Sequence, residues 1–353
     1  MKTKEKLLQE FAVLNEKELI YKKYYEVKDD PQAKERFLKE YEDYVRKNYL
    51  LIFDYPFIVY PKILREEDLY KHLSITKGSN VNIVRHLRYT PVFTHSHTFF
   101  TVLYVLKGHC GHTAGDLDLP MEEGDVFFLP PYEKQTISVF DDSIVLNIHI
   151  RRDTFGDYFF NVLRGNSILS EFFVSSLYSK DPVKGIMFHT QGNKEIKDLF
   201  LDMCLEVEED DRYSWRLLDN MVPILFAKLL RGFSDTVEMV GNEKDEFDEK
   251  RLQILSYISN HYNSITLEDV AEHFHYSVPY CSKLIQSEAG MNFVSFVRQI
   301  RMNHATAMLR NSNMPVAEIS YMIGYENTES FIRAFKKVYD MSPSAYRKRN
   351  SLS

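Results

Sequence analysis

Two histidines two residues apart, His95 and His97, have a type and spacing suited to chemistry. On a β-strand, residues i and i+2 point to the same side, so both imidazoles would face one side of a strand. Two imidazoles can begin a zinc or iron site, but closing it normally takes a third histidine or a carboxylate. His112 or His149 could supply that ligand only if the fold brings it close. We therefore predict no metal and no other cofactor.

The same histidine pair could instead line a small-molecule pocket. Arg88, Tyr104 and Tyr132 would add polar groups to the mouth of that pocket. The alternative is that the two imidazoles make ordinary structural hydrogen bonds, and the sequence does not decide between these interpretations. No nucleophile elbow, phosphate-binding glycine loop or carboxylate pair occurs, so catalysis is not predicted and would rest on the histidine pair alone.

The last hundred residues contain one pattern twice, about fifty residues apart. Apolar residues at helical spacing predict a short helix over 267–274, with Thr266 as its cap, and a second helix after a tight turn. The second copy begins near Val316. Short helix, turn and second helix form the helix-turn-helix pattern, in which the second helix enters the major groove of DNA. A long helix between the copies, from Phe293 to Leu309, would set their spacing.

The outward faces of the two second helices are what remains once their apolar residues are assigned to the core. Gln, Asn and Arg can pair with base edges, while Lys, Ser and Thr can reach bases or phosphates. We predict DNA contacts from Val278, Pro279, Tyr280, Ser282, Lys283 and Gln286 in the first copy, and from Asn327, Thr328, Glu329, Ser330, Arg333, Lys336 and Lys337 in the second. The basic run Arg347, Lys348 and Arg349 is either a contact to the DNA backbone or a solvated terminus.

Charge is divided along the chain in a way that suits DNA binding. Residues 250–353 contain 12 lysines and arginines and 8 aspartates and glutamates, a net charge of +4. The whole chain carries −7, so its first 249 residues carry −11. A basic domain on an acidic body is expected when one domain faces phosphates and the rest stays clear of them.

The elements that must position these residues follow from local patterns. Residues 1–50 predict a helical extension, and 51–155 contain β-rich runs separated by turn signals, typical of an antiparallel sandwich or barrel. Helical periodicity returns over 156–232, a segment suited to dimerisation. Residues 233–249 are acidic and predict a linker to the last domain, 250–353. The predicted fold class is α+β and multidomain, with a C-terminal all-α double helix-turn-helix domain.

Composition adds expectations about location and redox state. No apolar run is long enough to cross a membrane and no export signal is visible, so we expect a cytoplasmic protein without a membrane partner. The cysteines Cys110, Cys204 and Cys281 lie far apart without metal-ligand spacing, which predicts buried thiols rather than disulfides.

Residues from about 251 to 349 resemble the DNA-binding domain of the AraC/XylS family of bacterial regulators. The resemblance rests on LEDVAEHFHYSVPYCSKLIQSEAGMNFVSFVRQIRMNHATAMLR and on VAEISYMIGYENTESFIRAFKKVYDMSPSAYRK. The second stretch carries the family signature, which includes Ile319, Gly324, Tyr325, Phe331, Phe335, Pro343 and Tyr346. Asp340 stands where the family usually has glycine after the helix, and aspartate tolerates the left-handed conformation better than most residues.

The β-rich segment, with His95-Ser96-His97, Gly108 and the run from Gly124 to Pro130, resembles a cupin domain. Metal-binding cupins have Glu near position 101 and His near 135, where this chain has Thr101 and Gln135. The two resemblances imply a ligand-responsive activator that binds double-stranded DNA, contacts RNA polymerase, forms a homodimer and responds to a sugar or sugar derivative. The alternatives are a metal-dependent cupin enzyme with a regulatory tail and a constitutive DNA-binder with a non-binding cupin.

Overall fold

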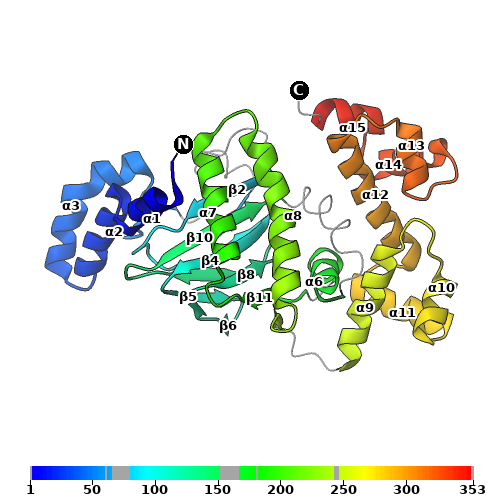
Figure 1. The fold of residues 1–353 in the computed structure, drawn as a ribbon, viewed down its shortest axis with the longest axis horizontal. Coiled ribbons are helices and arrows are strands. Elements are labelled where there is room, and N and C mark those ends of the chain that lie inside the picture. The colour runs from blue at the N-terminus through cyan, green and yellow to red at the C-terminus, as the bar shows by residue number, and fades with distance from the viewer. Residues whose placement is uncertain are drawn as a thin grey trace. The chain divides into compact units, whose positions relative to one another are not determined.

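The computed structural model describes residues 2–59, 62–65, 80–151, 167–179, 182–241 and 246–350. The chain divides into two units (Figure 1). Unit 1 comprises Met1–Arg151 and Lys184–Val240, and unit 2 comprises Arg152–Val183 and Gly241–Ser353. The chain therefore leaves unit 1, returns to it and ends in unit 2. No helix among the described residues is long and apolar enough to cross a membrane.

Unit 1 begins with three helices, which confirms the predicted helical extension. They are α1 (Lys4–Ala12), α2 (Glu16–Val27) and α3 (Pro31–Asn48). Each starts at a side chain that accepts hydrogen bonds from backbone N–H groups lacking a partner within the helix. The clearest case is Asn15, which forms a capping box with Glu18 at the start of α2.

The helices lead into two antiparallel sheets, as predicted for the β-rich segment. One sheet has the strand order β12-β11-β8-β4-β10-β2, and the other is built around β5, which pairs with β6, β7 and β9. The strands of the first are β2 (Val81–Arg85), β4 (Phe100–Lys107), β8 (Asp125–Leu129), β10 (Ile144–Ile150), β11 (Gly185–His189) and β12 (Glu238–Val240). The second contains β5 (His109–Ala114), β6 (Leu117–Asp118), β7 (Met121–Glu122) and β9 (Gln135–Ser138). A short parallel pair joins β1 (Ile63–Leu64) to β3 (Ser96–His97).

Side chains alternate along these strands, so each strand of the larger sheet has two distinct faces. Leu103 and Val105 of β4 and Val145 of β10 point between the two sheets and belong to one buried apolar cluster. Residues of β5, β7 and β9 complete that cluster from the other side.

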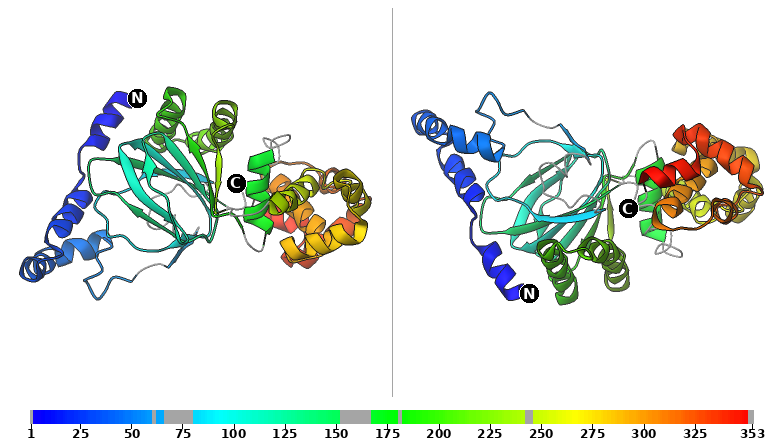
Figure 2. Two further views of the ribbon diagram at one scale, coloured as in Figure 1. Left: turned by 90° about the horizontal axis from the view of Figure 1, so that it is seen from below. Right: turned by 90° about the horizontal axis from the view of Figure 1, so that it is seen from above.

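The outer face of the larger sheet is covered by two helices, α7 (Lys194–Glu209) and α8 (Ser214–Phe233). Tyr104 of β4 stacks on Phe200 of α7, with ring centroids 4.0 Å apart. Figure 2 shows both helices on the same face of the sheet.

Strands β11 and β12 correct the predicted boundaries, because they lie in the segments assigned to helix (156–232) and linker (233–249). The first four residues of β11 are buried, so its sequence shows no alternation of period two. Short apolar runs of this kind cannot be told from helix by periodicity. The β domain therefore extends beyond 51–155. Residues 57–59, which lie in an apolar run of the predicted β-rich segment, form no strand, and residues 60–61 of that run lie outside the described residues.

Unit 2 is helical and contains the two predicted helix-turn-helix copies. Its helices are α6 (Ser167–Tyr178), α9 (Glu246–Asn260), α10 (Leu267–Phe274), α11 (Val278–Ala289), α12 (Phe293–Asn311), α13 (Val316–Met322), α14 (Thr328–Tyr339) and α15 (Pro343–Asn350). Helices α10 and α11 form the first copy, α13 and α14 the second, and α12 separates them. Thr266 caps α10 as predicted, and Asp340 ends α14 in the left-handed conformation, with φ of 55°.

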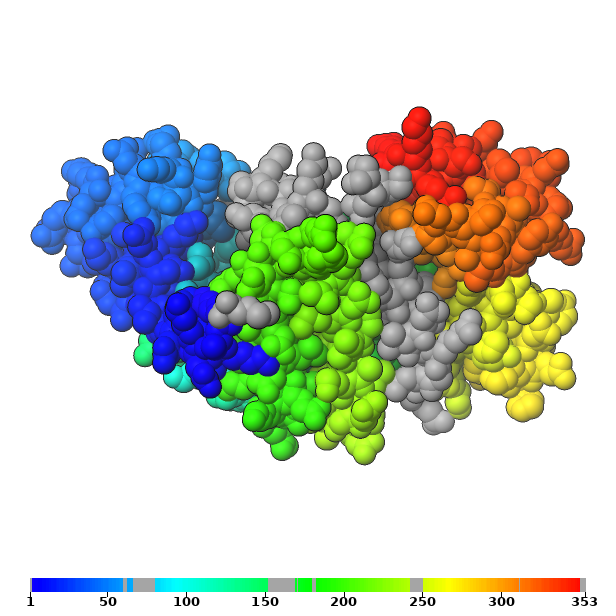
Figure 3. All heavy atoms as spheres, turned by 45° about the horizontal axis from the view of Figure 1, so that its top comes forward, coloured from blue at the N-terminus to red at the C-terminus, as the bar shows by residue number. Residues whose placement is uncertain are grey.

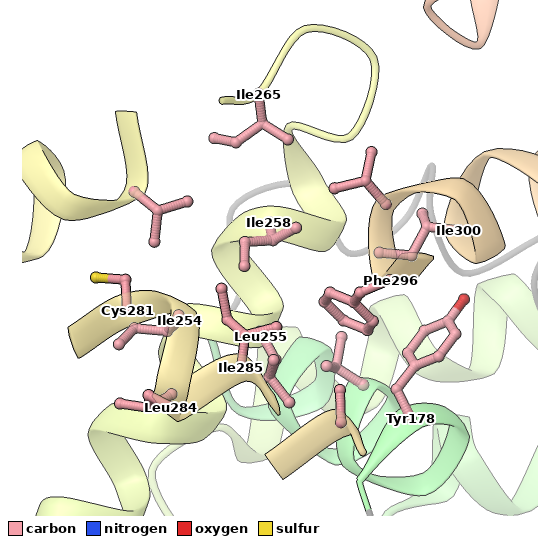
Figure 4. Packing of buried hydrophobic residues seen from close by; sticks show 14 of the residues in the cluster. Tyr178, Ile254, Leu255, Ile258, Ile265, Cys281, Leu284, Ile285, Phe296 and Ile300 are labelled. Carbon is pink, nitrogen blue, oxygen red and sulfur yellow. The ribbon is translucent and has the colours of Figure 1, made fainter. Parts of the chain in front are cut away.

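Helix α6 precedes β11 in the sequence but packs in the core of the first helix-turn-helix. Val174 and Tyr178 belong to the same buried cluster as residues of α9, α11 and α12 (Figure 4). The Tyr178 ring meets Phe296 edge-on at 5.2 Å, and its hydroxyl accepts a hydrogen bond from Asn303 Nδ2 at 2.9 Å. The helical core of unit 2 therefore extends beyond the predicted domain 250–353.

A buried ion pair joins the N-terminal extension to the β domain. Arg88 Nε donates to Glu18 Oε1 at 3.0 Å, and Arg85 Nη2 donates to Glu18 Oε2 at 2.8 Å. Glu18 is fully buried and Arg88 is 1% exposed. A second ion pair, from Lys4 to Asp202 at 2.8 Å, joins α1 to α7. Figure 3 shows the N-terminal extension, in blue, against the green surface that includes α7.

We predict that Glu18→Gln lowers the free energy of unfolding by about 3–5 kcal/mol, because it leaves the buried guanidinium of Arg88 and the half-buried one of Arg85 without their counter-charge. Burial alone would raise the pKa of Glu18, but hydrogen bonds from Arg88 and Asn15 and the charge of Arg85 hold it below its ordinary value. The contribution is therefore present above the unfolded pKa and is lost as the pH falls through the folded pKa.

Urea unfolding at pH 7 measures this loss. The matched control is Glu35→Gln, whose partner Lys39 is 75% exposed and whose removal should change stability by less than about 1 kcal/mol. Equal losses of stability in Glu18→Gln and Glu35→Gln would contradict the role of Glu18 as a buried counter-charge.

Candidate functional site

Polar side chains on several strands of the β domain point between the two sheets. Asn147 and His149 share a face of β10 with Val145, and Thr101 shares a face of β4 with Leu103. The same rule places His112 of β5 and Gln135 of β9 beside their apolar neighbours. We name this set the inner polar cluster, and its members are Asn82, His95, His97, Thr101, His112, Gln135, Asn147 and His149.

The carboxamide of Gln135 lies among the histidines of the cluster. Its Nε2 is 3.5 Å from His95 Nε2 and 3.4 Å from His97 Nδ1, and its Oε1 is 3.3 Å from His112 Nε2. The ring centroid of His149 is 5.7 Å from that of His97. The structure therefore brings the predicted pair together with both other histidines on which the sequence argument depended.

This geometry does not suit a metal ion. Ring nitrogens of His95 and His97 face the Nε2 of Gln135, and an NH₂ group donates hydrogen bonds and does not ligate metals. His97 Nδ1 is also 2.7 Å from Thr101 Oγ1, which stands where metal-binding cupins have a carboxylate. Among the described residues, no group of three histidine, cysteine or acidic side chains is arranged to hold a metal.

Burial keeps the imidazoles of the cluster uncharged at neutral pH. Burial and the neighbouring His95 lower the pKa of His149 to about 3. Burial lowers the pKa of His112 to about 4 and that of His97 well below its ordinary value. A neutral imidazole offers one donor and one acceptor, so the cluster presents uncharged groups of both kinds. Such a site suits an uncharged polar ligand, because a buried ligand charge would need a charged partner.

Four buried atoms of the cluster have no hydrogen-bond partner in the part of the chain that the structure describes. They are Asn82 Nδ2, His112 Nδ1, Asn147 Oδ1 and His149 Nδ1. Asn82 and His149 are directly opposite in the β2–β10 ladder, and Asn147 lies two residues along the same strand. Each unpaired buried atom costs about 1–3 kcal/mol. Hydroxyl groups of a ligand could satisfy these donors and acceptors.

The other three residues predicted to line the pocket, Arg88, Tyr104 and Tyr132, do not belong to the inner polar cluster. Arg88 is buried against Glu18, so its guanidinium is already paired. Tyr104 lies an odd number of residues from Thr101 and therefore faces α7 on the outer side of the sheet. Tyr132 is 55% exposed, although its backbone N–H donates to the carbonyl oxygen of His97 at 2.7 Å.

Asn82 and Asn147 were not predicted, although the sequence held a signal for Asn147. Asn147 stands two residues from His149 and from Val145 in a strand that is otherwise apolar. Aligning Asn147 with Val145 and His149 at a period of two would have placed it with the histidines. In β2 the apolar Val81 and Ile83 alternate with Asn82, so the same rule gives no such signal there. The pairing of Asn82 with His149 across the ladder depends on the register, which only the structure gives.

The second candidate site is the outward surface of α11 and α14. The apolar residues assigned to the core, including Cys281, Ile285, Phe331 and Phe335, are buried. The predicted contact residues divide by exposure. Pro279, Lys283, Gln286, Asn327, Glu329, Arg333, Lys336 and Lys337 are exposed, and Val278, Tyr280, Ser282, Thr328 and Ser330 are half-buried.

Some of these side chains also have structural partners. Asn327 Oδ1 accepts from the backbone N–H of Ser330 at 2.8 Å and so caps α14. Arg333 Nη2 donates to Ser330 Oγ at 3.1 Å, which holds its guanidinium at the exposed start of the helix. Arg347, which was open to two interpretations, donates to the carbonyl oxygens of Leu309 and Met314.

Two family models match the chain. An AraC-like ligand binding domain matches residues 83–219, and a helix-turn-helix domain matches residues 270–349. The chain belongs to the AraC family of transcription regulators. The match to the ligand-binding domain spans seven of the eight residues of the inner polar cluster and also includes α6.

Relatives of this AraC-family protein bear names of the same kind. It is 25% identical over 72% of its length to an uncharacterized HTH-type transcriptional regulator, YfiF of Bacillus subtilis, of which it covers 78%. It is 37% identical over 45% of its length to YdiP of Escherichia coli, covering 53% of that protein. It is 20% identical over 82% of its length to the HTH-type transcriptional activator RhaR of an Enterobacter species, covering 98%.

Two solved structures also resemble the AraC-family chain. ToxT from Vibrio cholerae is 14% identical and matches 78% of this chain and all of its own, with a TM-score of 0.32. The C-terminal domain of AraT from Geobacillus stearothermophilus is 34% identical and matches 29% of this chain and 87% of its own, with a TM-score of 0.28.

The lowered histidine pKa values predict a loss of stability in acid. As the pH falls from about 6.5 towards 4, the unfolded chain binds protons on these imidazoles and the folded chain does not. His149→Gln should therefore flatten part of this fall. Urea unfolding at pH 7 and pH 4.5 measures the slope, with His261→Gln, at an exposed position, as the control. An unchanged slope in His149→Gln would contradict a neutral buried His149.

Proposed function

We propose that this regulator is a ligand-responsive activator whose effector binds at the inner polar cluster. The observation that supports this most directly is the group of unpartnered buried polar atoms on β2, β5 and β10. Buried polar groups in proteins normally have partners, so a concentration of exceptions calls for a ligand or ordered water. An effector can then switch DNA binding if it has different affinities for two states of the protein.

The proposed effector is uncharged and rich in hydroxyl groups, such as a sugar or sugar derivative, and the regulated genes would concern carbohydrates. The cluster offers neutral donors and acceptors and contains no aspartate, glutamate, lysine or arginine. Arg85 and Arg88, which could have neutralised an anionic ligand, are paired with Glu18. Phe99, whose ring stacks on His97 at 4.6 Å, adds the apolar surface that such pockets combine with polar groups.

The remaining parts of the proposal concern partners and location. The activator role is supported by the name of the relative RhaR, and it implies contact with RNA polymerase. Tyr213, Leu217 and Ile224 leave exposed apolar groups along one side of α8, and we assign this stripe to a second copy in a homodimer. We place the protein in the cytoplasm, with its DNA, and assign it no catalytic activity.

We predict that Asn147→Leu abolishes effector binding without lowering the stability of the unliganded chain by more than about 1 kcal/mol, because the substitution removes an unpaired buried amide. The measurement is a thermal shift of the full chain with neutral sugars and polyols. A ligand at one hundred times its Kd adds about 2.7 kcal/mol of stability. The matched control is Tyr104→Phe, which removes another unpartnered buried atom but on the outer face of the sheet.

The thermal-shift measurement should test each neutral sugar beside an anionic form of the same sugar, its uronate or phosphate. A shift by an anion alone would contradict the neutral effector. A shift that survives Asn147→Leu would place the site elsewhere, and no shift with any sugar would favour the constitutive DNA-binder.

We predict that Arg333→Ala weakens specific DNA binding by about 1–3 kcal/mol if Arg333 reads a base edge. The DNA is a site selected from a random library by the full chain. Affinity should also fall steeply with salt, since lysine and arginine contacts release counterions from the phosphates. Arg46→Ala, a change of equal charge in the N-terminal extension, is the control. Salt-insensitive binding, or equal losses in both variants, would count against this surface.

A further inference from the structure

The two helix-turn-helix copies have separate apolar cores. The first core contains Cys281 and Ile285, and the second contains Phe331 and Phe335. Tyr262, in the loop between α9 and α10, packs against both of them. Its ring also stacks on His304 of α12, with centroids 3.9 Å apart. This loop therefore contacts both copies and the helix that separates them.

Arg301 of α12 holds the same loop through its backbone. Its Nε donates to the carbonyl oxygen of Tyr262 at 2.8 Å, and its Nη2 donates to that of Asn263 at 3.0 Å. Its guanidinium also lies over the Tyr325 ring, 5.6 Å from the centroid. One planar side chain thus bridges the loop of the first copy and the turn of the second.

Gly324 lies where the turn of the second copy meets the loop of the first. Its φ is +84°, and a Cβ built on it would lie 1.9 Å from the carbonyl oxygen of Asn263. That oxygen is the one that accepts from Arg301 Nη2. Any side chain at 324 would therefore push the two copies apart as well as strain the backbone.

We propose that Arg301, Tyr262, Asn263, Gly324 and Tyr325 form a clasp that fixes the two DNA-reading helices at one separation and rotation. The clasp makes Arg301 and Gly324 positioning residues, which select DNA by the spacing between its two half-sites. Neither residue needs to touch DNA for this. The inference rests on the proposed DNA-binding surface of α11 and α14.

Helix α12 alone would fix the spacing less strictly. Its 19 residues span about 28 Å, close to the ~34 Å between successive major-groove segments on one face of DNA. One inserted base pair rotates the second half-site by about 34–36° and moves it by ~3.4 Å. If α11 and α14 were joined by α12 alone, twisting of α12 could let them follow that rotation. With the clasp as a second connection, they could not.

The test uses the full chain and the site that the wild-type chain selects from a random DNA library. Affinities are measured for that site and for versions with one or two base pairs inserted between its half-sites. One insertion should lower wild-type affinity at least about tenfold, but that of Arg301→Ala and Gly324→Ala less than about threefold. The readout is a ratio for one protein preparation, so a smaller folded fraction does not change it.

Arg301→Lys separates the clasp from a phosphate contact. Lysine keeps the positive charge but cannot donate to two carbonyl groups from one planar fork, so its spacing profile should resemble that of Arg301→Ala. A wild-type profile in both Arg301 variants would overturn the clasp and leave DNA binding intact. Failure of the wild-type chain to select any site would overturn the proposed DNA-binding surface, and the clasp with it.

Discussion

Polar atoms buried without partners cost free energy, and among the residues that the structure describes the β domain holds four of them in one cluster between its sheets. This cost must be offset by the apolar residues around it. Val145 and Leu103 are fully packed within two residues of Asn147 and Thr101 on the same strand faces. The ion pair of Glu18 with Arg88 contributes from outside the sheets by holding the N-terminal extension on the domain.

The sequence predicted the elements that have a clear period and a clear cap. Helices α10 and α12 begin and end within about two residues of their predicted positions, because the amphipathic pattern and the cap at Thr266 act locally. The signature residue Gly324 was recognised from the family pattern, but its reason was not visible. That reason is the carbonyl oxygen of Asn263, some sixty positions earlier, and only the fold brings the two together.

The sequence predicted only part of the candidate site, because only the fold brings its distant residues together. His95 and His97 stand out because of their spacing, whereas Asn147 and His149 join them through the register of β10 with β2 and β4. Arg88 was assigned to the pocket by its charge, but a buried guanidinium must have a counter-charge, and Glu18 supplies it from another element. Tyr104 was misplaced by one step of the alternation. The error at Arg88 and the omission of Asn82 concern long-range pairings, which local patterns do not contain, whereas the error at Tyr104 concerns the alternation along one strand.

Unit 2 shows that the domain boundary itself depends on such pairing. Helix α6 has the composition of a buried helix, and Val174 and Tyr178 pack with residues more than seventy positions later. Because α6 lies between β10 and β11 in the sequence, the chain crosses between the units at residues 151–152, 183–184 and 240–241. The helical core of unit 2 therefore combines α6, which precedes β11 in the sequence, with helices of the DNA-binding part.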